Sequence, residues 1–340
     1  MDLREFLTGL SIDPGALAGS IADPKGAVAK AGLDETGQRL LRSRSATAMW
    51  NFLLGRSNGA DGAAETPLPT EIQEALDGKR GSLVVVGTGI RTVGQMTVEA
   101  LAWIRVADVV PYLVADPIGE DVVRHLNPAG AVSLRGYYGE GLHRKQSYDA
   151  MIQHILGNVR AGKRTVAAFY GHPGVFAYPS HESVRQARRE GYLAFMLPGI
   201  SAEDCLFADL NVDPAVNGCQ SFEATDFLLH DRIVDTSSQL VLWQVGVLGD
   251  WTYRHDGYDL RAFPLLVQRL TALYGPWHEC TLYEAAVLPS LPPTITKIPL
   301  SQLTAQYVNA GTTMYVPPVR AAAVNWSVAS AMDLPRQQAS

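Results

Sequence analysis

The chain has 340 residues, of which 47% are hydrophobic and 18% charged, and its formal net charge is −6. This length and balance predict a soluble globular protein of two or three domains with a sizeable core. The acidic balance argues against nucleic acid as the main partner. No apolar run reaches the ~18 residues that a membrane span needs.

Two features of the chain bear on its compartment. Asp2, Arg4 and Glu5 interrupt the segment that a signal peptide would keep apolar. Cys205, Cys219 and Cys280 are odd in number and widely spaced, which favours reduced thiols over disulfides or a zinc site. We therefore expect a cytoplasmic protein without a metal site.

The first 56 residues have the pattern of a small helical module. Leu3, Phe6, Leu7 and Leu10 follow helical spacing, a Pro-Gly break follows at residues 14–15, and the pattern predicts one last helix over 35–55 that ends at Gly55. Residues 57–70 are small, polar and rich in Gly and Pro, as linkers are. We therefore expect a helical domain over 1–56 and a linker over 57–80.

From Gly81 onward, short β-branched runs alternate with helical patterns. The expected strands lie at 82–87, 109–115, 165–170, 194–199 and 239–246, and the expected helices at 93–107, 147–162 and 181–191, the last with Ser180 as N-cap. This alternation predicts an α/β fold with a mostly parallel sheet covered on both faces. Residues 280–318 are richer in strand patterns, as a second α/β lobe would be, and residues 319–340 form a small, apolar tail without a regular period.

The first expected strand ends in a glycine-rich turn, with glycines at 87, 89 and 94. Thr92 stands where a dinucleotide fingerprint needs its third glycine, and Asp108 precedes the second strand instead of ending it. A tight turn near a different ligand, or simply a well-packed turn, explains the pattern better.

A second turn, "AFYGHPGVFAYPSH" at 168–181, follows another expected strand. Gly171, Pro173 and Gly174 would bend the backbone there, and such turns carry chemistry in α/β proteins. His172 could be a metal ligand or a general base, but no partner ligand stands at short spacing. A structural histidine is the favoured interpretation.

Residues 81–318 resemble the tetrapyrrole methylase family of S-adenosylmethionine-dependent methyltransferases. The matching pieces occur in order: "VVVGTGI", "YGHPGVF", "LPGISAEDCLFADL", "LWQVGV" and "PTIT". Within that family the chain is most similar to the borosin peptide-backbone α-N-methyltransferases, through "RGYYGEGLHRKQSYDAM" and "FEATDFLL". The resemblance implies the tetrapyrrole methylase fold, with two α/β lobes at about 81–197 and 198–318.

The resemblance also implies the site residues. It assigns catalysis to Tyr138, Arg144 and Tyr148, and it implies S-adenosylmethionine as cofactor with S-adenosylhomocysteine as product. The implied cofactor-binding residues are Gly87, Gly89, Tyr170, Gly171, His172, Pro173, Gly174, Val175, Ser201, Ala202, Gln244, Val245 and Thr294. Arg135 stands where the family has a further tyrosine, so its role is open, with Tyr137 as a partial substitute.

These residue types suit methylation of a peptide nitrogen. The amide lone pair is delocalised into the carbonyl, so the N–H proton must be removed and the developing oxyanion stabilised. A tyrosine, whose ordinary pKa is about 10, becomes a feasible base beside a permanent cation such as Arg144. A second phenol could donate to the same oxygen. The alternative is that these tyrosines are packing residues with satisfied hydroxyls.

The two ends of the chain suggest the substrate. Residues 1–56 resemble the borosin-binding domain that docks a precursor peptide in two-protein borosin systems; a generic helical dimerisation arm is the alternative. Residues 319–340 are the candidate core peptide, in which Pro335 has no N–H to methylate, or else an ordinary frayed terminus.

We therefore expect iterative backbone α-N-methylation in the biosynthesis of a ribosomally made peptide (a RiPP), by a homodimer and with its own tail as preferred substrate. A separate precursor peptide, a small-molecule methylase of tetrapyrrole type and a catalytically silent binding protein remain the alternatives.

Overall fold

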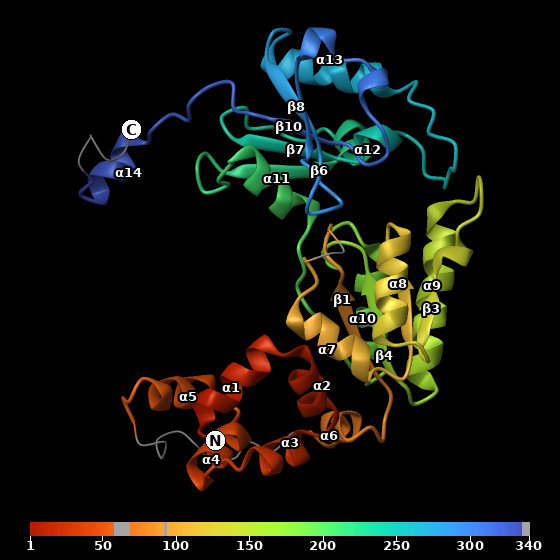
Figure 1. The fold of residues 1–340 in the computed structure, drawn as a ribbon. Helices are drawn as coiled ribbons and strands as arrows, with labels where there is room; N and C mark the ends of the chain where they lie inside the picture. The colour runs from red at the N-terminus through yellow and green to blue at the C-terminus, as the bar shows by residue number, and fades with distance from the viewer. Residues whose placement is uncertain (58–68, 92–93, 335–340) are drawn as a thin grey trace. The chain divides into compact units, whose positions relative to one another are not determined.

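The computed structural model describes residues 1–57, 69–91 and 94–334 (Figure 1). The chain divides into two compact units, Met1–Ala202 with Val287–Pro289, and Glu203–Ala286 with the chain from Ser290 onward. Residues 58–68 of the expected linker, the Thr92 position of the first glycine turn and Pro335 lie outside the described residues.

The first unit begins with five short helices: α1 (Leu3–Ile12), α2 (Pro14–Ala22), α3 (Pro24–Ala31), α4 (Glu35–Ser43) and α5 (Ala46–Leu53). Aspartate or serine side chains cap all five starts, as free helix N–H groups require. The expectation of one helix over 35–55 was wrong. Arg44 adopts a left-handed conformation (φ 52°) that ends α4, and Ser45 caps α5. Gly55, at φ 68°, follows the end of α5.

A five-stranded parallel sheet forms the centre of the first unit, in the order β3-β2-β4-β1-β5. Its strands are β1 (Ser82–Gly87), β2 (Val110–Leu113), β3 (Ala131–Ser133), β4 (Arg164–Phe169) and β5 (Leu193–Met196). The helices are α6 (Thr70–Leu76), α7 (Val98–Val106), α8 (Pro117–Leu126), α9 (Arg144–Arg160) and α10 (Tyr178–Arg189), with a 3₁₀ turn, η1, at Arg135–Tyr137.

Strand β1 is buried on both faces, and this places a core on each side of the sheet. Leu83 and Val85 pack in one cluster with α9 and α10, whereas Val84 and Val86 pack in another with α7 and α8. Side chains alternate along a strand, so this continuous apolar run serves two faces at once. The expectation of a parallel sheet covered on both faces is confirmed.

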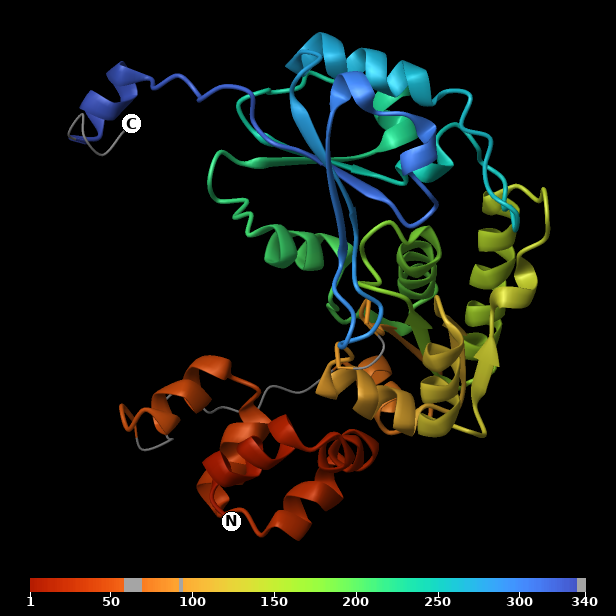
Figure 2. The same cartoon turned by 45° about the horizontal axis from the view of Figure 1, so that its top comes forward.

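The second unit holds a mixed sheet in the order β6-β7-β10-β8-β9, in which only the β6–β7 pair is parallel (Figure 2). Its strands are β6 (Cys219–Glu223), β7 (Gln239–Trp243), β8 (Glu279–Glu284), β9 (Thr294–Pro299) and β10 (Thr313–Val316). Helices α11 (Ala202–Leu210), α12 (Ala224–Leu229), α13 (Phe263–Tyr274) and α14 (Trp326–Ala331) and the 3₁₀ turns η2 (Val245–Val247), η3 (Leu300–Gln302) and η4 (Ala305–Tyr307) accompany it.

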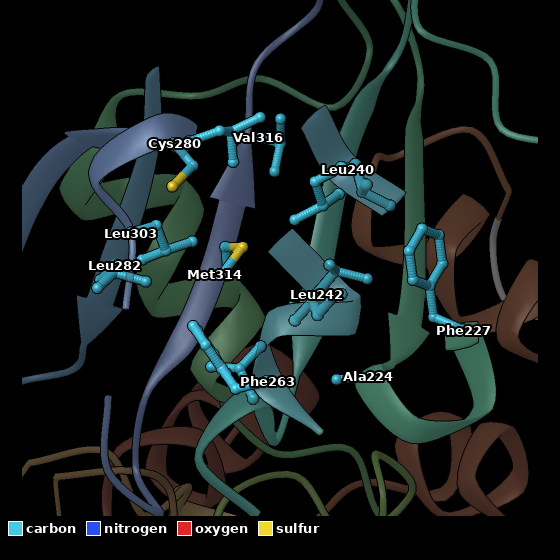
Figure 3. Packing of buried hydrophobic residues seen from close by; sticks show 14 of the residues in the cluster. Ala224, Phe227, Leu240, Leu242, Phe263, Cys280, Leu282, Leu303, Met314 and Val316 are labelled. Atoms are coloured by element: carbon cyan, nitrogen blue, oxygen red, sulfur yellow. The ribbon is translucent and has the colours of Figure 1, made fainter. Parts of the chain in front are cut away.

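The core of this unit lies between the sheet and its helices (Figure 3). Leu242 and Met314, on neighbouring strands, pack in one cluster with Phe227 of α12 and Phe263 of α13. Cys280 is fully buried in the same cluster, and its burial raises the pKa of the thiol to about 12. A thiol so protonated at neutral pH is an unreactive packing residue.

Two further expectations differ from the structure. Ser180 is not an N-cap, because α10 already begins at Tyr178 and Pro179 fits the first turn of the helix; the side chain of Ser180 is buried inside it. The tail is not without regular structure, because Asn325 accepts a hydrogen bond from the Val328 amide and caps α14.

The described residues contain neither a helix long and apolar enough to cross a membrane nor a cluster of side chains suited to a metal ion.

The buried side chain of Asn127 joins the end of α7 to the turn before β3 by hydrogen bonds. It is only 7% exposed, its Nδ2 donates to the carbonyls of Ile104 and Ala107 at 2.8 Å each, and its Oδ1 accepts from the Gly130 amide at 2.9 Å. We expect Asn127→Ala to lower the free energy of unfolding by about 2–4 kcal/mol, because buried groups lose their partners. Asn158→Ala removes a part-buried hydrogen bond to the His154 carbonyl at 2.9 Å and a long, exposed one from the Lys163 ammonium at 3.4 Å. It should cost less than about 1 kcal/mol, because water can replace partners that are not fully buried. Equal losses in urea unfolding would contradict this role.

Candidate functional site

Two glycine turns meet at the carboxyl ends of β1 and β4. Gly171 donates its amide to the Gly89 carbonyl at 3.0 Å, and Gly89 donates its amide to the Gly171 carbonyl at 3.3 Å. Both residues have positive φ, 69° and 74°, which only glycine adopts readily. The turn after one central strand is therefore tied directly to the turn after its neighbour.

The packing of these turns leaves no room for side chains. A Cβ on Gly87 would lie 2.3 Å from the Gly171 carbonyl oxygen and 2.8 Å from Cδ of Pro173. A Cβ on Gly199, which follows β5, would lie 3.1 Å from the same oxygen. The loops after β1, β4 and β5 thus form one close-packed group of backbone, and a ligand at this edge would meet peptide groups more than side chains.

His172 makes hydrogen bonds within its own loop. Its Nδ1 accepts a hydrogen bond from the Gly174 amide at 2.9 Å, and its carbonyl accepts from the Val175 amide at 3.1 Å. The His181 Nε2 donates to the Gly174 carbonyl at 2.9 Å, which ties the loop to the first turns of α10. Tyr170, just before this loop, is 38% exposed and hydrogen-bonded through its amide to the Leu113 carbonyl at 2.9 Å.

The sequence did not single out Gln95, although it closes the first glycine turn. Its Oε1 accepts hydrogen bonds from the amides of Ile90 at 2.9 Å and Arg91 at 2.7 Å, and the side chain is only 8% exposed. A buried amide that satisfies two backbone donors holds such a turn in one conformation.

The structure brings Tyr138 and Tyr148 together. Tyr138 follows η1 and Tyr148 lies in the second turn of α9, and their ring centroids are 6.3 Å apart with an interplanar angle of 75°. Both rings are half-buried against the α9 side of the sheet core. Arg144, the first residue of α9, stands four residues before Tyr148, so the two share one face of the helix.

A third tyrosine extends this pair. Tyr178, at the start of α10, has its ring centroid 6.3 Å from that of Tyr148, at 36°. It is 44% exposed, and it was not among the residues expected at the site. Tyr178 comes eight positions after Tyr170, and this spacing did not indicate a place at the site. It lies beside Tyr148 because α10 begins next to α9.

The side chain of Arg135 is bound to a carboxylate and to two backbone carbonyls. Its Nε pairs with the Glu120 carboxylate at 3.3 Å, and its guanidinium donates to the carbonyls of Val114 at 3.1 Å and Ala115 at 3.4 Å. It therefore ties η1 to the chain after β2 and to α8. Tyr137 has its hydroxyl 3.0 Å from Nδ1 of His154, on α9.

The remaining expected residues divide between the units. Ser201 is buried and Ala202 is the first residue of α11. Gln244, Val245 and Thr294 belong to the second unit. Gln244 has a left-handed backbone (φ 58°), Val245 is buried in the core and can offer only its backbone, and Thr294 is exposed at the start of β9.

Comparisons with known proteins agree with this architecture. The chain is 45% identical over 251 residues to a methyltransferase/ribosomally synthesized cyclic peptide dendrothelin A precursor from Dendrothele bispora, covering 73% of this chain and 60% of that protein. It is 44% identical over 260 residues to the omphalotin A precursor of the same description from Omphalotus olearius, covering 75% of this chain and 62% of that protein. The chain thus spans about three fifths of the length of these relatives.

A solved structure shows the same fold. The uroporphyrin-III-C-methyltransferase from Thermus thermophilus matches with a TM-score of 0.50 at 18% identity, covering 76% of this chain and 98% of that one. The family model described as "Tetrapyrrole (Corrin/Porphyrin) Methylases" matches residues 82–289, which is more than half of the chain. The chain therefore belongs to the tetrapyrrole methylase family.

Proposed function

We propose that this protein transfers methyl groups from S-adenosylmethionine to backbone nitrogens of a peptide, with its own C-terminal tail as the preferred acceptor. The observation that carries the proposal is the Tyr138–Tyr148 pair one helical turn from Arg144, in a chain whose relatives are named as methyltransferases and peptide precursors at once. The small-molecule alternative lacks such support from these relatives.

The glycine turns suit the methyl donor. In open parallel sheets, ligands bind beyond the carboxyl ends of the strands, where Gly87, Gly89 and Gly171 lie. Glycine carries no side chain that would stand between its peptide groups and a ligand beyond the strand ends. Tyr170, 38% exposed beside these turns, offers an aromatic face to a cation. When bound, S-adenosylmethionine would supply an electrophilic methyl group on a sulfonium.

The tyrosine pair would supply the proton chemistry. The amide N–H proton would pass to the phenolate oxygen of Tyr138, and the nitrogen would form its bond to the methyl carbon as the carbon–sulfur bond breaks. Arg144 would stabilise the phenolate or the oxyanion that develops on the peptide carbonyl, and Tyr148 would donate a hydrogen bond to that oxyanion. Tethering of the acceptor makes the step effectively unimolecular.

The tail can present its backbone at low cost. Helix α14 has only six residues, and helices this short are marginally stable in water. Trp326, Val328 and Met332 are 45%, 50% and 62% exposed, so little packing has to be broken to extend the segment. A homodimer, which the resemblance implies, would let one subunit's tail enter the site of the other, and the N-terminal helices would dock the precursor segment. The free cysteines accord with a cytoplasmic protein.

Tyr138→Phe tests the assignment of the base. We expect methyl increments on backbone nitrogens between Val319 and Ser340 in the wild-type protein, and a loss of rate of at least about 100-fold in Tyr138→Phe, because general-base catalysis contributes on this scale. Intact mass and fragmentation of the C-terminal peptide measure both. Tyr192→Phe is the matched control, because this half-buried tyrosine packs against the same core.

Each outcome of that experiment has a definite meaning. Unchanged methylation in Tyr138→Phe would remove Tyr138 from the chemistry. An unmodified tail in a protein that binds S-adenosylhomocysteine would transfer the substrate role to a separate peptide.

Gly87→Ala tests the donor site. The new methyl group would displace the loop at 171–173, so we expect S-adenosylhomocysteine to bind at least about 10-fold more weakly by isothermal titration. Gly157→Ala is the control, because a Cβ there meets no atom within 4 Å and the position is helical. Melting temperatures establish that both variants are folded. Equal affinity of Gly87→Ala and the wild-type protein would place the donor elsewhere.

A further inference from the structure

The turn that carries Tyr138 is held to α9 at two points. Tyr138 contacts the Tyr148 ring, and its neighbour Tyr137 contacts the His154 ring. Tyr148 and His154 are six residues apart on the helix, which is about 9 Å along the axis and about a third of a turn around it. Tyr137 and Tyr138 therefore contact α9 at two points that differ in position along the helix axis and around it. Rotation of the η1 turn about α9 would break at least one of these two contacts.

The Tyr137–His154 contact is a specific hydrogen bond. The Tyr137 hydroxyl lies 3.0 Å from Nδ1 of His154, and the ring centroids are 5.8 Å apart at 67°. Burial and the nearby Lys163 lower the pKa of His154, so its imidazole is neutral at pH 7. A neutral imidazole has one donor and one acceptor nitrogen, and within the described part of the chain the buried Nε2 meets no hydrogen-bond partner. The hydroxyl of Tyr137 is therefore the side-chain partner that orients this ring.

The start of the η1 turn is also fixed, through Arg135 and Leu134. Arg135 reaches the carbonyls of Val114 and Ala115 and the Glu120 carboxylate, and Leu134 before it is fully buried. Between these anchors, the amides of Tyr137 and Tyr138 donate to the carbonyls of Leu134 and Arg135 at 3.1 and 3.0 Å. Because of this short 3₁₀ bonding, a shift of Tyr137 is passed directly to Tyr138.

We propose that Tyr137 and His154 are positioning residues whose hydrogen bond holds Tyr138 edge-on against Tyr148. Tyr137 is thus no substitute for the phenol that the family has at position 135, since its hydroxyl is turned to His154 and acts through its neighbour. The catalytic meaning of this pair rests on the proposed function; its structural meaning does not.

The test compares Tyr137→Phe, His154→Leu and His154→Asn with the wild-type protein and Tyr192→Phe. The asparagine amide can take the place of Nδ1, whereas leucine fills space without a polar group. The first readout is the rate at which the first methyl appears on the tail after mixing with saturating S-adenosylmethionine. The second is the ¹H–¹³C spectrum of ring-labelled tyrosine, with the Tyr138 signals assigned from Tyr138→Phe.

We expect Tyr137→Phe and His154→Leu each to slow methyl transfer about 10- to 100-fold, because a misplaced catalytic group loses rate on this scale. The double variant should be no slower than either single one, as two halves of one interaction require. His154→Asn should stay within about 3-fold of the wild-type rate, which a merely structural histidine would not predict. Melting temperature and affinity for S-adenosylhomocysteine control for folding and donor binding.

The spectra separate this inference from the proposed function. The Tyr138 ring signals should shift in Tyr137→Phe and His154→Leu and return in His154→Asn, whether or not the tail is methylated. Unchanged Tyr138 signals, or a His154→Asn variant as slow as His154→Leu, would overturn the positioning role. A wild-type protein that methylates nothing would refute the function, and the spectra would still decide the role of the pair.

Discussion

The close approach of two backbone turns is the constraint on which the site depends. The reciprocal hydrogen bonds between Gly89 and Gly171 join the loops after β1 and β4, and the Gly171 carbonyl fills the space where Gly87 would carry a side chain. This close approach needs glycine, which has no side chain and adopts positive φ readily, and it occurs where the carboxyl ends of the parallel strands β1 and β4 meet at one edge. Everything proposed for the donor follows from this edge being bare backbone, and Tyr170 emerges directly from it.

The fold was predictable where a strand is buried on both faces. The run "SLVVVG" has no polar alternation because Leu83 and Val84 face different cores, and this is also why the pattern indicated a sheet with two covered faces. Strand β3 was missed because it is short: it has three residues and makes no apolar run. The break at Arg44 was missed because the apolar spacing continues through it, although Ser45 carried a capping signal.

The site was predictable in part, through the resemblance more than through the residue pattern. Packing was the alternative interpretation of Tyr138 and Tyr148, and the structure shows that packing and pairing coexist, because both rings lie against the core and against each other. His154 could not have been found, because its partner is 17 residues away and meets it only once η1 has folded against α9. Arg135 was recognisable as a departure from the tyrosine of the family. Its hydrogen bonds go to backbone carbonyls, and a sequence pattern does not predict such bonds.

A crystal structure with S-adenosylhomocysteine bound tests the central claim most directly. The ligand should lie against the peptide groups of residues 87–89 and 170–175, with its sulfur nearer to Tyr170 than to any other aromatic ring of the first unit. The Tyr138–Tyr148 pair should keep its edge-on contact in that complex. Ligand density away from these turns, with the loops at 87–89 and 171–174 unchanged, would contradict the placement of the donor and the chemistry derived from it.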